Sequence, residues 1–445
     1  MENAQKQFHF SRRSKLLNIL DENSLVIVLG STNVPRSYDD IHRFKQNKNF
    51  YYFTGFNQPN AVLLMAPGGM EVHDGKTNRI VKTKEVLFVQ KADPLKETWF
   101  GRRLAFDKVK GELGINLALE NSKLGDVISD LLTRDKINKI YISLNDLDAL
   151  EGEIKDQLKN FTRSWITLST NVQLLDLNYI VGKMRFVKND FEVEQVRYAS
   201  TVTASAFYNS IQQVKPGMYE YQVQAMLEYY YKKFGCQDTA FETIVAGGNN
   251  TCILHYNTNR NKLKAGELLL IDSGAEYNYY NGDLTRTIPV SGKFTKEQRE
   301  IYQIVLDAQY AVIKKIKPGV KLTELKKFSV EQLKKGVQKL GLLKKGHDIT
   351  EYTLHGVGHH IGLDTHDAVA NKKIGKVDFD TLLVGNIITV EPGLYFPESA
   401  KEIPAKYRKI GVRIEDDVLV TKTGSEVLSD ALPKEVEDIE FLMME

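Results

Sequence analysis

Apolar residues follow different spacings in the two parts of this 445-residue chain. A chain of that length is too long for one ordinary hydrophobic core, so two domains are expected. In the first part, short β-rich runs alternate with polar helical stretches, which predicts an α/β amino-terminal domain over residues 1–175. Four of these runs read as buried strands: 24–30, 61–67, 85–90 and 139–144. Residues 175–190 then read as a connector.

The second part, residues 176–445, opens with a long helical pattern. Its apolar residues stand three or four positions apart, or at multiples of those spacings: Val193, Val196, Phe207, Ile211 and Val214. Pro216-Gly217 predicts the end of this helix. Further along, the lysine-rich stretch 314–345 carries a stripe of leucines. Its lysines therefore read as the solvated face of a helix rather than as a nucleic-acid surface.

The second part also repeats itself. The run "IQQVKPGM" at 211–218 returns as "IKKIKPGV" at 313–320, and "LLLIDSG" at 268–274 returns as "IITVEPG" at 387–393. Two matches in the same order indicate a duplication. Each copy reads as a helix, a Lys-Pro-Gly turn, a second helix and an antiparallel strand pair that carries two acids. Two related halves that meet face to face would bring these acids to one centre.

Composition and charge narrow the function classes. The chain is 42% apolar and 26% charged, which is typical of a folded protein. Its 60 basic and 57 acidic residues leave a net charge of +3, which gives no reason to expect a nucleic-acid partner. Two cysteines cannot form a disulfide framework, and no stretch resembles a signal peptide or the roughly 20 apolar residues of a membrane-spanning helix. We therefore expect a cytoplasmic protein with no membrane partner.

Five residues carry the chemistry of the second part: Asp272, Asp283, His359, Glu391 and Glu415. The four carboxylates lie within apolar, strand-like sequence, where an unpaired charge is costly. A pair of divalent cations would neutralise them, so the pattern predicts a dinuclear metal site. The alternative is that they are cap, turn or surface residues. That alternative is about even for any one of them, but it is disfavoured for a set at duplicated positions.

The donor types limit the metal. Carboxylate oxygens favour Mg, Ca or Mn, and one imidazole shifts the preference toward Mn, Co, Zn or Fe. With four carboxylates and one histidine, some carboxylates must bridge two ions. Two cations that share one water lower its pKa, which makes a hydroxide nucleophile available at neutral pH.

Five of the nine histidines cluster in the second part: His255, His355, His359, His360 and His366. The glycines in "HGVGHHIGLDTHD" argue against a helix, so this run is not the helical two-histidine zinc motif. Imidazoles that do not reach the metals can donate hydrogen bonds to a developing oxyanion or a substrate carbonyl. We assign such a role to His255 and His366, and we interpret His360 as structural.

At these residues the chain resembles the metal-dependent aminopeptidase P and prolidase family, the pita-bread metallopeptidases. The motifs are "LLLIDSGAEY…GDLTRT", "HGVGHHIGLDTHD", "TVEPGLYF" and "GVRIEDDVLV", and the resemblance covers nearly the whole length. It implies an α/β amino-terminal domain followed by an α+β pita-bread domain. In the latter, a curved antiparallel sheet is duplicated about a pseudo-twofold axis.

The resemblance also implies the ligand roles. Asp283 and Glu415 bridge the two ions, Asp272 chelates one of them, and His359 with Glu391 completes the other. The usual metal of the family is manganese, with cobalt, zinc and iron as alternatives. Glu391 would also pass a proton from the bridging hydroxide to the leaving proline nitrogen.

Further residues take roles from the same resemblance. His255 and His366 would hold the substrate carbonyl and stabilise the tetrahedral intermediate, and His355 would help to form the pocket for the proline ring. Three other residues would orient the ligating carboxylates: Arg413, Tyr395 and Thr285. The family usually has a glycine after "THD", whereas Ala368-Val369-Ala370 follows here, so we expect a different shape at the adjacent rim.

The amino-terminal runs "RFKQNKNFYYFTGFNQPNAVLLM" and "ETWFGRRL" resemble aminopeptidase P more than prolidase. In that branch the amino-terminal domain gates the substrate and forms a homo-oligomer, a dimer or a tetramer. Trp99 corresponds there to a tryptophan that reaches a neighbouring subunit's active site. The alternative for Trp99, with equal weight, is an ordinary core or surface residue.

The expected activity is removal of an amino-terminal residue that precedes proline. The imide nitrogen of proline lacks the N–H that other peptidases bind, so such a bond needs a dedicated enzyme. One alternative is a prolidase restricted to Xaa-Pro dipeptides. Methionine aminopeptidases share the acids but need no 175-residue amino-terminal domain. A non-enzymatic pita-bread module that binds other proteins would have lost the carboxylate set, whereas all five ligands are present here.

Overall fold

The computed structural model describes residues 2–74, 79–134, 137–144, 172–343, 346–367 and 378–444. The chain forms two compact units, Met1–Met184 and Arg185–Glu445. The boundary between these units falls within the expected connector at 175–190, most of which forms helix α8 (Asn178–Phe186). In the described part of the chain, no helix is both long and apolar enough to cross a membrane.

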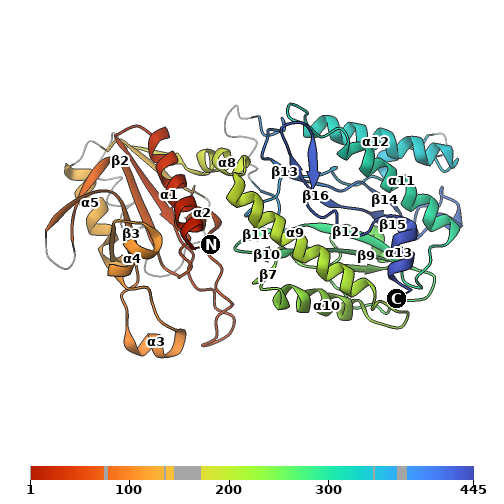
Figure 1. The fold of residues 1–445 in the computed structure, drawn as a ribbon, viewed down its shortest axis with the longest axis horizontal. Coiled ribbons are helices and arrows are strands. Elements are labelled where there is room, and N and C mark those ends of the chain that lie inside the picture. Colours follow the sequence, from red (N-terminus) through yellow and green to blue (C-terminus); the bar gives the residue numbers. More distant parts are fainter. Residues whose placement is uncertain are drawn as a thin grey trace. The chain divides into compact units, whose positions relative to one another are not determined.

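The first unit contains a mixed six-stranded sheet in the order β4-β3-β2-β1-β5-β6 (Figure 1). Its strands are β1 (Ser24–Leu29), β2 (Val62–His73), β3 (Ile80–Val89), β4 (Leu117–Glu120), β5 (Lys139–Ile142) and β6 (Gln173–Asp176). All four predicted strands are present. The prediction missed β4 and β6, because strands of four residues show too little alternation to be recognised.

In the described residues before β6, the helices of this unit are α1 (Glu2–Ile19), α2 (Lys48–Thr54), α3 (Pro94–Phe100), α4 (Phe106–Leu113) and α5 (Leu124–Arg134). A buried ion pair joins α1 to β3, because Arg13 Nε donates to Glu85 Oε2 at 2.7 Å. Arg13 also donates to the carbonyl of Phe53, so its buried charge is well hydrogen-bonded.

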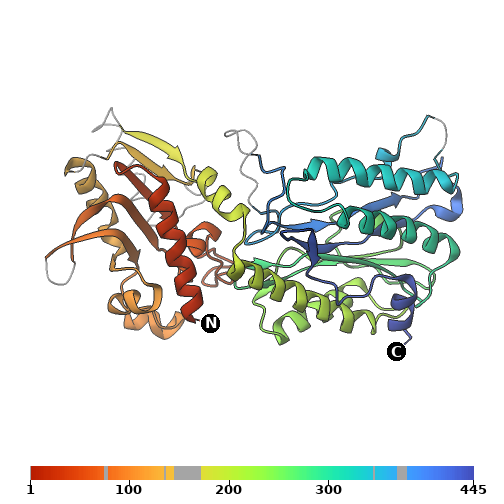
Figure 2. The same ribbon diagram turned by 45° about the horizontal axis from the view of Figure 1, so that its top comes forward.

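The second unit has two helix pairs, α9 (Asp190–Ile211) with α10 (Glu220–Lys233) and α11 (Lys296–Ile313) with α12 (Leu322–Lys339), and ends in α13 (Val436–Leu442). Figures 1 and 2 show these pairs beside the strands of the same unit. Helix α9 ends at Ile211, earlier than predicted, so Val214 lies in the following turn. The lysine-rich stretch forms α12 as predicted, with Leu325 and Leu333 buried.

Every strand pair among the described residues of the second unit is antiparallel. They form four small sheets: β11-β10-β7, β12-β9-β8, β13-β16-β17 and β14-β15. The strands are β7 (Asp238–Thr239), β8 (Ile244–Gly247), β9 (Leu268–Ser273), β10 (Ala275–Tyr277), β11 (Tyr280–Asn281), β12 (Leu284–Pro289), β13 (Ile387–Val390), β14 (Gly393–Phe396), β15 (Ile410–Arg413), β16 (Asp416–Val420) and β17 (Ser425–Val427).

The predicted duplication is visible in the backbone of the two Lys-Pro-Gly turns. Gly217 N donates to Leu263 O at 2.9 Å in the first half, and Gly319 N donates to Leu382 O at 2.8 Å in the second. Both glycines have a positive φ, 96° and 90°, which a side chain would strain. Each turn thus fastens its helix pair to the segment that leads into an acid-bearing strand.

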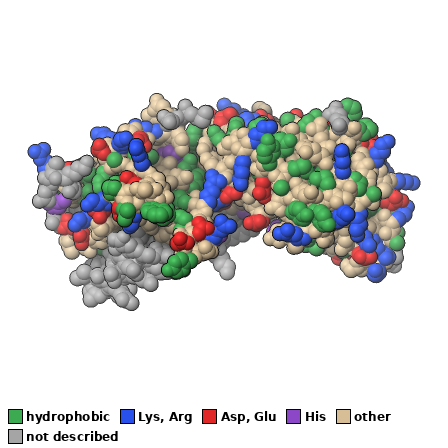
Figure 3. Space-filling model, turned by 90° about the horizontal axis from the view of Figure 1, so that it is seen from below, with side chains coloured by type: hydrophobic (Ala, Val, Ile, Leu, Met, Phe, Trp, Pro, Cys, Tyr) green, Lys and Arg blue, Asp and Glu red, His purple; other side chains and the backbone are tan. Residues whose placement is uncertain are grey.

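Charged side chains do not gather into one area on the face drawn in Figure 3. Lysine, arginine, aspartate and glutamate are interspersed there, and hydrophobic side chains occur in small groups. This distribution agrees with the nearly balanced charge of the sequence.

Candidate metal centre

The four carboxylates stand at the ends of paired strands in the second unit. Asp272 lies in β9, Asp283 precedes β12, Glu391 follows β13 and Glu415 precedes β16. Thr285 pairs with Asp272 in the ladder of β9 and β12, and it also forms a β-bridge with Glu415. The backbone of Thr285 therefore joins the two halves at the level of the acids.

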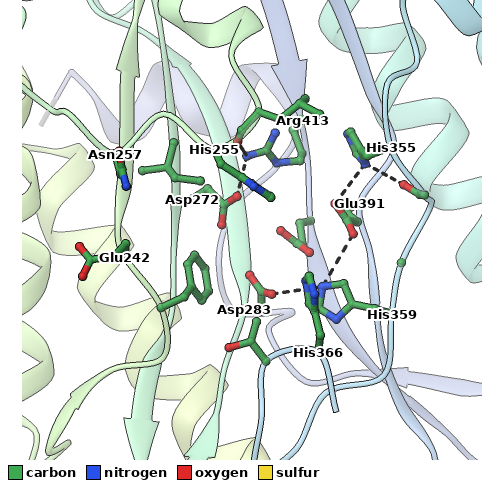
Figure 4. A pocket seen from close by; sticks show the side chains of 17 residues that line it. Glu242, His255, Asn257, Asp272, Asp283, His355, His359, His366, Glu391 and Arg413 are labelled. Carbon is green, nitrogen blue, oxygen red and sulfur yellow. Dashed lines mark hydrogen bonds and ion pairs between the residues drawn. The ribbon is translucent and has the colours of Figure 1, made fainter. Parts of the chain in front are cut away.

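A cavity of about 670 Å³ opens where these strand ends meet (Figure 4). All five predicted ligands line it, together with three of the other histidines, Arg413 and several residues to which the sequence analysis gave no role. The lining residues are Asp272, Asp283, His359, Glu391, Glu415, His255, His355, His366, Arg413, Phe241, Glu242, Ile244, Leu254, Asn257, Gly356, Gly358 and Thr365. The fold thus gathers side chains that are up to 174 positions apart in the sequence, from Phe241 to Glu415.

Three of the predicted ligands lie closest together. Asp283, His359 and Glu415 each offer a ligand atom, and these atoms lie within 4.8 Å of one another. His359 Nε2 is 3.5 Å from Asp283 Oδ2 and 3.8 Å from Glu391 Oε1. Its Nδ1 lies 3.2 Å from the carbonyl of His360, and donation there leaves Nε2 available to a cation.

A single glycine lets His359 approach this cluster. A Cβ at Gly358 would stand 2.0 Å from the carbonyl oxygen of Thr389, so only glycine fits between the loop and β13. The backbone of His359 then makes two hydrogen bonds to Thr389. The His359 N–H donates to the threonine hydroxyl at 3.2 Å, and the His359 carbonyl accepts from the threonine N–H at 2.9 Å. The predicted absence of a helix in this run is confirmed, and its cause is this close contact with the strand.

The three residues expected to orient the carboxylates form a connected hydrogen-bond network. Arg413 donates to Asp272 Oδ2 at 2.5 Å, to the Tyr395 hydroxyl at 2.9 Å and to Thr285 Oγ1 at 3.2 Å. Thr285 Oγ1 in turn donates to Glu415 Oε2 at 2.8 Å. One guanidinium therefore restrains acids from both halves of the unit.

The acids carry more negative charge than these neighbours compensate. Burial raises the pKa of Asp283 to about 7, and burial with the nearby carboxylates also raises the pKa of Asp272 and Glu415. Burial lowers the pKa of His359, but its hydrogen bond and charge interaction with Asp283 outweigh this and raise it to about 9. Asp272 Oδ1 is buried without a hydrogen-bond partner among the described residues. Oxygen donors with excess negative charge fit divalent cations.

The remaining histidines divide between the cavity and the core. His355 Nε2 lies 2.6 Å from the Tyr395 hydroxyl, and its Nδ1 is 3.2 Å from Glu391 Oε2. Burial would raise the pKa of Glu391, but this contact and the charges of nearby cations lower it. The rings of His359 and His366 lie 4.1 Å apart.

His360 points away from the cavity, as the structural interpretation requires. It is buried, its Nε2 lies 3.1 Å from the carbonyl of Phe379, and its ring packs against Phe186 with centroids 4.6 Å apart. Burial lowers the pKa of His360 to about 4, so it is neutral near pH 7.

Of the three acids of "EDD" at 415–417, the sequence analysis named only Glu415 as a ligand and gave no role to Asp416 or Asp417. Only Glu415 lines the cavity, whereas Asp416 binds Arg286 at 2.8 Å and Lys434 at 2.7 Å. Asp417 Oδ2 instead accepts the backbone N–H of Asp283 at 3.1 Å. The alternation of side chains along a strand signals that neighbouring acids face different surroundings.

Two predictions about the rim and the first unit have separate outcomes. Trp99 lies on α3 and is 78% exposed, so the core alternative for it is wrong. Ala368-Val369-Ala370, which were expected to reshape the rim, lie outside the described residues.

Comparison with known proteins relates both units to one kind of enzyme. Residues 194–422 match the model of metallopeptidase family M24, and residues 9–141 match that of the aminopeptidase P N-terminal domain. The chain is 34% identical to the Xaa-Pro aminopeptidase of Escherichia coli strain K12, over 100% of this chain and 99% of that protein. It is 30% identical to Homo sapiens Xaa-Pro aminopeptidase 3, over 96% of this chain and 84% of that protein.

Solved structures give the same result for the fold. The aminopeptidase PepP of Pseudomonas aeruginosa aligns with a TM-score of 0.88 at 33% identity, over 99% of this chain and 98% of that one. A zinc-substituted Escherichia coli aminopeptidase P in complex with product aligns with a TM-score of 0.88 at 34% identity, with the same coverage. The predicted fold class is therefore confirmed.

Proposed function

Because the chain belongs to metallopeptidase family M24, we propose that it is a dinuclear-metal exopeptidase that releases the amino-terminal residue from peptides with proline in second position. The observation that carries this proposal is the convergence of four carboxylates and His359 on one cavity. Similarity to Xaa-Pro aminopeptidases over the whole chain, including the amino-terminal unit, favours this activity over that of a prolidase.

Five side chains would hold the ions: Asp272, Asp283, His359, Glu391 and Glu415. Asp283 and Glu415, one from each half, would serve both ions, and their ligand atoms lie within 4.8 Å of each other and of His359. Bound divalent ions would supply Lewis acidity and a water that is nucleophilic at neutral pH. We propose manganese as the metal, because four oxygen donors and one imidazole suit it.

The other cavity residues bind substrate and move protons in this proposal. His255 and His366 hold the scissile carbonyl and donate to it as negative charge develops. His355, fixed by the Tyr395 hydroxyl, forms one wall of the proline pocket. Glu391 carries a proton to the leaving nitrogen, and Arg413 with Thr285 keeps the carboxylates in place.

We also propose a cytoplasmic homo-oligomer, a dimer or a tetramer, in which α3 of the amino-terminal domain packs against a second copy. Leu95, Trp99 and Phe100 are 72%, 78% and 61% exposed, and this density of apolar side chains is unusual for a free surface. Trp99 would then contribute to a neighbour's substrate site. The domain ranges 1–175 and 176–445 are part of this proposal.

Trp99→Ala tests the contact between copies. The substitution should lower the sedimentation coefficient or raise KM, and a change in neither would contradict the role of Trp99 at this contact.

A peptide-length assay tests the proposed activity. The enzyme, loaded with manganese, is offered Xaa-Pro dipeptides and Xaa-Pro-Yaa tripeptides with the same first residue, and the released amino acid is quantified. Turnover of the tripeptide supports the proposal. Turnover of the dipeptide alone would indicate a prolidase instead, and no turnover of either would remove the assignment.

A further inference from the structure

A cluster of four charged side chains lies beside the cavity, at the far end of the loop that begins with His359: Arg185, Lys188, Asp364 and Asp367. We propose that this cluster is a positioning device for His366, which acts by fixing the loop from His359 to Asp367. The inference rests on the proposed function, because it gives a catalytic consequence to the placement of His366.

The cluster is compact and mostly buried. Arg185 Nη2 lies 2.5 Å from Asp364 Oδ2 and also contacts Asp367 Oδ1. Lys188 Nζ lies 2.9 Å from Asp367 Oδ2, so each oxygen of Asp367 faces its own cation. The side chains of Lys188 and Asp367 are 0% and 1% exposed, whereas that of Asp364 is 46% exposed. Asp367 is therefore the central anion.

Asp367 is covalently next to His366, so its position determines where that imidazole can lie. The backbone N–H of Asp367 donates to the carbonyl of His360 at 2.8 Å and closes the loop. At its two ends, the rings of His359 and His366 meet 4.1 Å apart. A shift of Asp367 would therefore be transmitted to His366 directly.

The loop is also shaped around the cluster. A Cβ at Gly362 would stand 2.3 Å from Asp367 Oδ2 and 2.9 Å from Lys188 Cε, so a side chain at this position would displace the ion pair. Asn281 holds the same turn from the other side, because its N–H donates to the Gly362 carbonyl at 2.9 Å. The loop thus has little freedom between the cluster and β11.

Stability alone is a weak reason for such a cluster. Removing charges from water costs several kcal/mol per ion, and apolar residues of similar volume often replace a buried ion pair without loss of stability. What an apolar replacement cannot reproduce is a cation beside each oxygen of Asp367, with a hydrogen bond from Arg185 to one of them. This arrangement suits a residue whose neighbour must be placed to within a fraction of an ångström.

A double-mutant cycle tests the inference on the metal-loaded full chain with an Xaa-Pro-Yaa peptide. Asp367→Asn keeps the shape of the side chain but weakens its hold on both cations. We expect kcat to fall by about 10- to 100-fold, the size of effect produced by a displacement near 1 Å, with KM and metal content nearly unchanged. In a His366→Ala background, the same change should lower kcat no further, because the residue it positions is absent.

Glu85→Gln serves as the matched control. It disrupts a buried arginine–carboxylate pair remote in sequence from the cavity, Arg13–Glu85 in the first unit, and should lower the unfolding midpoint without changing kcat in either background. Asp364→Asn is the second variant if Asp367→Asn does not fold, since its half-exposed carboxylate shares Arg185. It should show a smaller loss of kcat with the same dependence on His366.

The outcomes separate the inference from the activity on which it rests. Equal losses of kcat in the wild-type and His366→Ala backgrounds would overturn the positioning role while leaving the peptidase assignment intact. Loss of metal together with kcat would overturn it as well, since the cluster would then support the ligands. A wild-type enzyme with no turnover of Xaa-Pro-Yaa peptides would overturn both.

Discussion

Two loops bring histidines to the cavity, one from each half of the second unit. Each loop is held through a buried carboxylate, but the partners of that carboxylate are neutral in one half and cationic in the other. The loop with His255 is held by Glu220, a fully buried carboxylate that accepts four hydrogen bonds from neutral groups. Two of these come from backbone N–H groups, Gly247 at 2.8 Å and Asn261 at 2.7 Å. The loop with His366 is held by cations on Asp367.

The difference shows that a duplicated backbone does not require duplicated chemistry. The Lys-Pro-Gly turns of both halves keep the same hydrogen bond to the chain before the acid-bearing strand. The anchors lie in different places, Glu220 at the start of α10 and Arg185 at the end of α8. Symmetry is therefore retained where it aligns the carboxylates, and it is lost where each half holds its own histidine.

The largest effect is expected where the two halves must act together. Asp283→Ala removes the proposed bridging ligand from the first half and leaves Glu415 of the second half without its counterpart. We expect turnover to fall by more than about 1,000-fold and metal content to drop, measured by peptide hydrolysis and by metal analysis of the purified protein. Appreciable turnover with full metal content would contradict the two-metal assignment.

Next in size are the two histidines themselves. His366→Ala and His255→Ala should each lower kcat by about 100- to 1,000-fold, the cost of losing one donor to a developing oxyanion. Both variants should keep their metal, because neither imidazole is a proposed ligand. A loss of metal in only one of them would show that the halves differ in ligation and not only in how their loops are fastened.

Glu220→Gln probes the anchor of the His255 loop. The amide cannot accept on both sides, so at least one buried donor around Gly247, Tyr256 or Asn261 loses its partner. We expect a loss of about 3 kcal/mol in the free energy of unfolding, measured by urea denaturation. Glu228→Gln on the same helix is the control, because Glu228 accepts one hydrogen bond within the described part of the chain, from Gln224, and that bond is only partly buried. Equal stability of the two variants would contradict the anchoring role.

The residues that converge on the cavity could be proposed from the sequence, whereas the residues that anchor the histidine loops could not, for a physical reason. Asp272 and Glu391 stand out because an acid within an apolar strand, or directly after one, contradicts its surroundings. Arg185 and Lys188 lie in ordinary helical and linker sequence, where basic residues are expected on the surface. Their burial follows from partners about 180 positions away, which no local pattern records.

The orienting residues fall between these cases. The roles of Arg413, Tyr395 and Thr285 were expected only through the family resemblance. An arginine, tyrosine or threonine within a strand is common, so no local sequence pattern marks it as a residue that orients a carboxylate. The structure shows why they matter locally, because Arg413 contacts both Asp272 and Thr285. In the fold, short strands such as β4 and β6 escaped prediction because only tertiary pairing defines them.

The smallest predicted effect is a pH dependence that belongs to one anchor. Burial would raise the pKa of Asp367, but Arg185 and Lys188 outweigh it and lower the pKa from 3.8 to about 2. A carboxyl whose pKa is depressed in the folded state contributes stability above its unfolded pKa and loses it as pH falls through the folded pKa. The contribution is on the order of 2 kcal/mol near pH 7 and should disappear between about pH 4 and pH 2. The urea midpoints for unfolding of the wild type and of Asp367→Asn should therefore converge as pH falls across that window. A difference between the two midpoints that stays constant with pH would show that Asp367 supports the loop by shape rather than by charge.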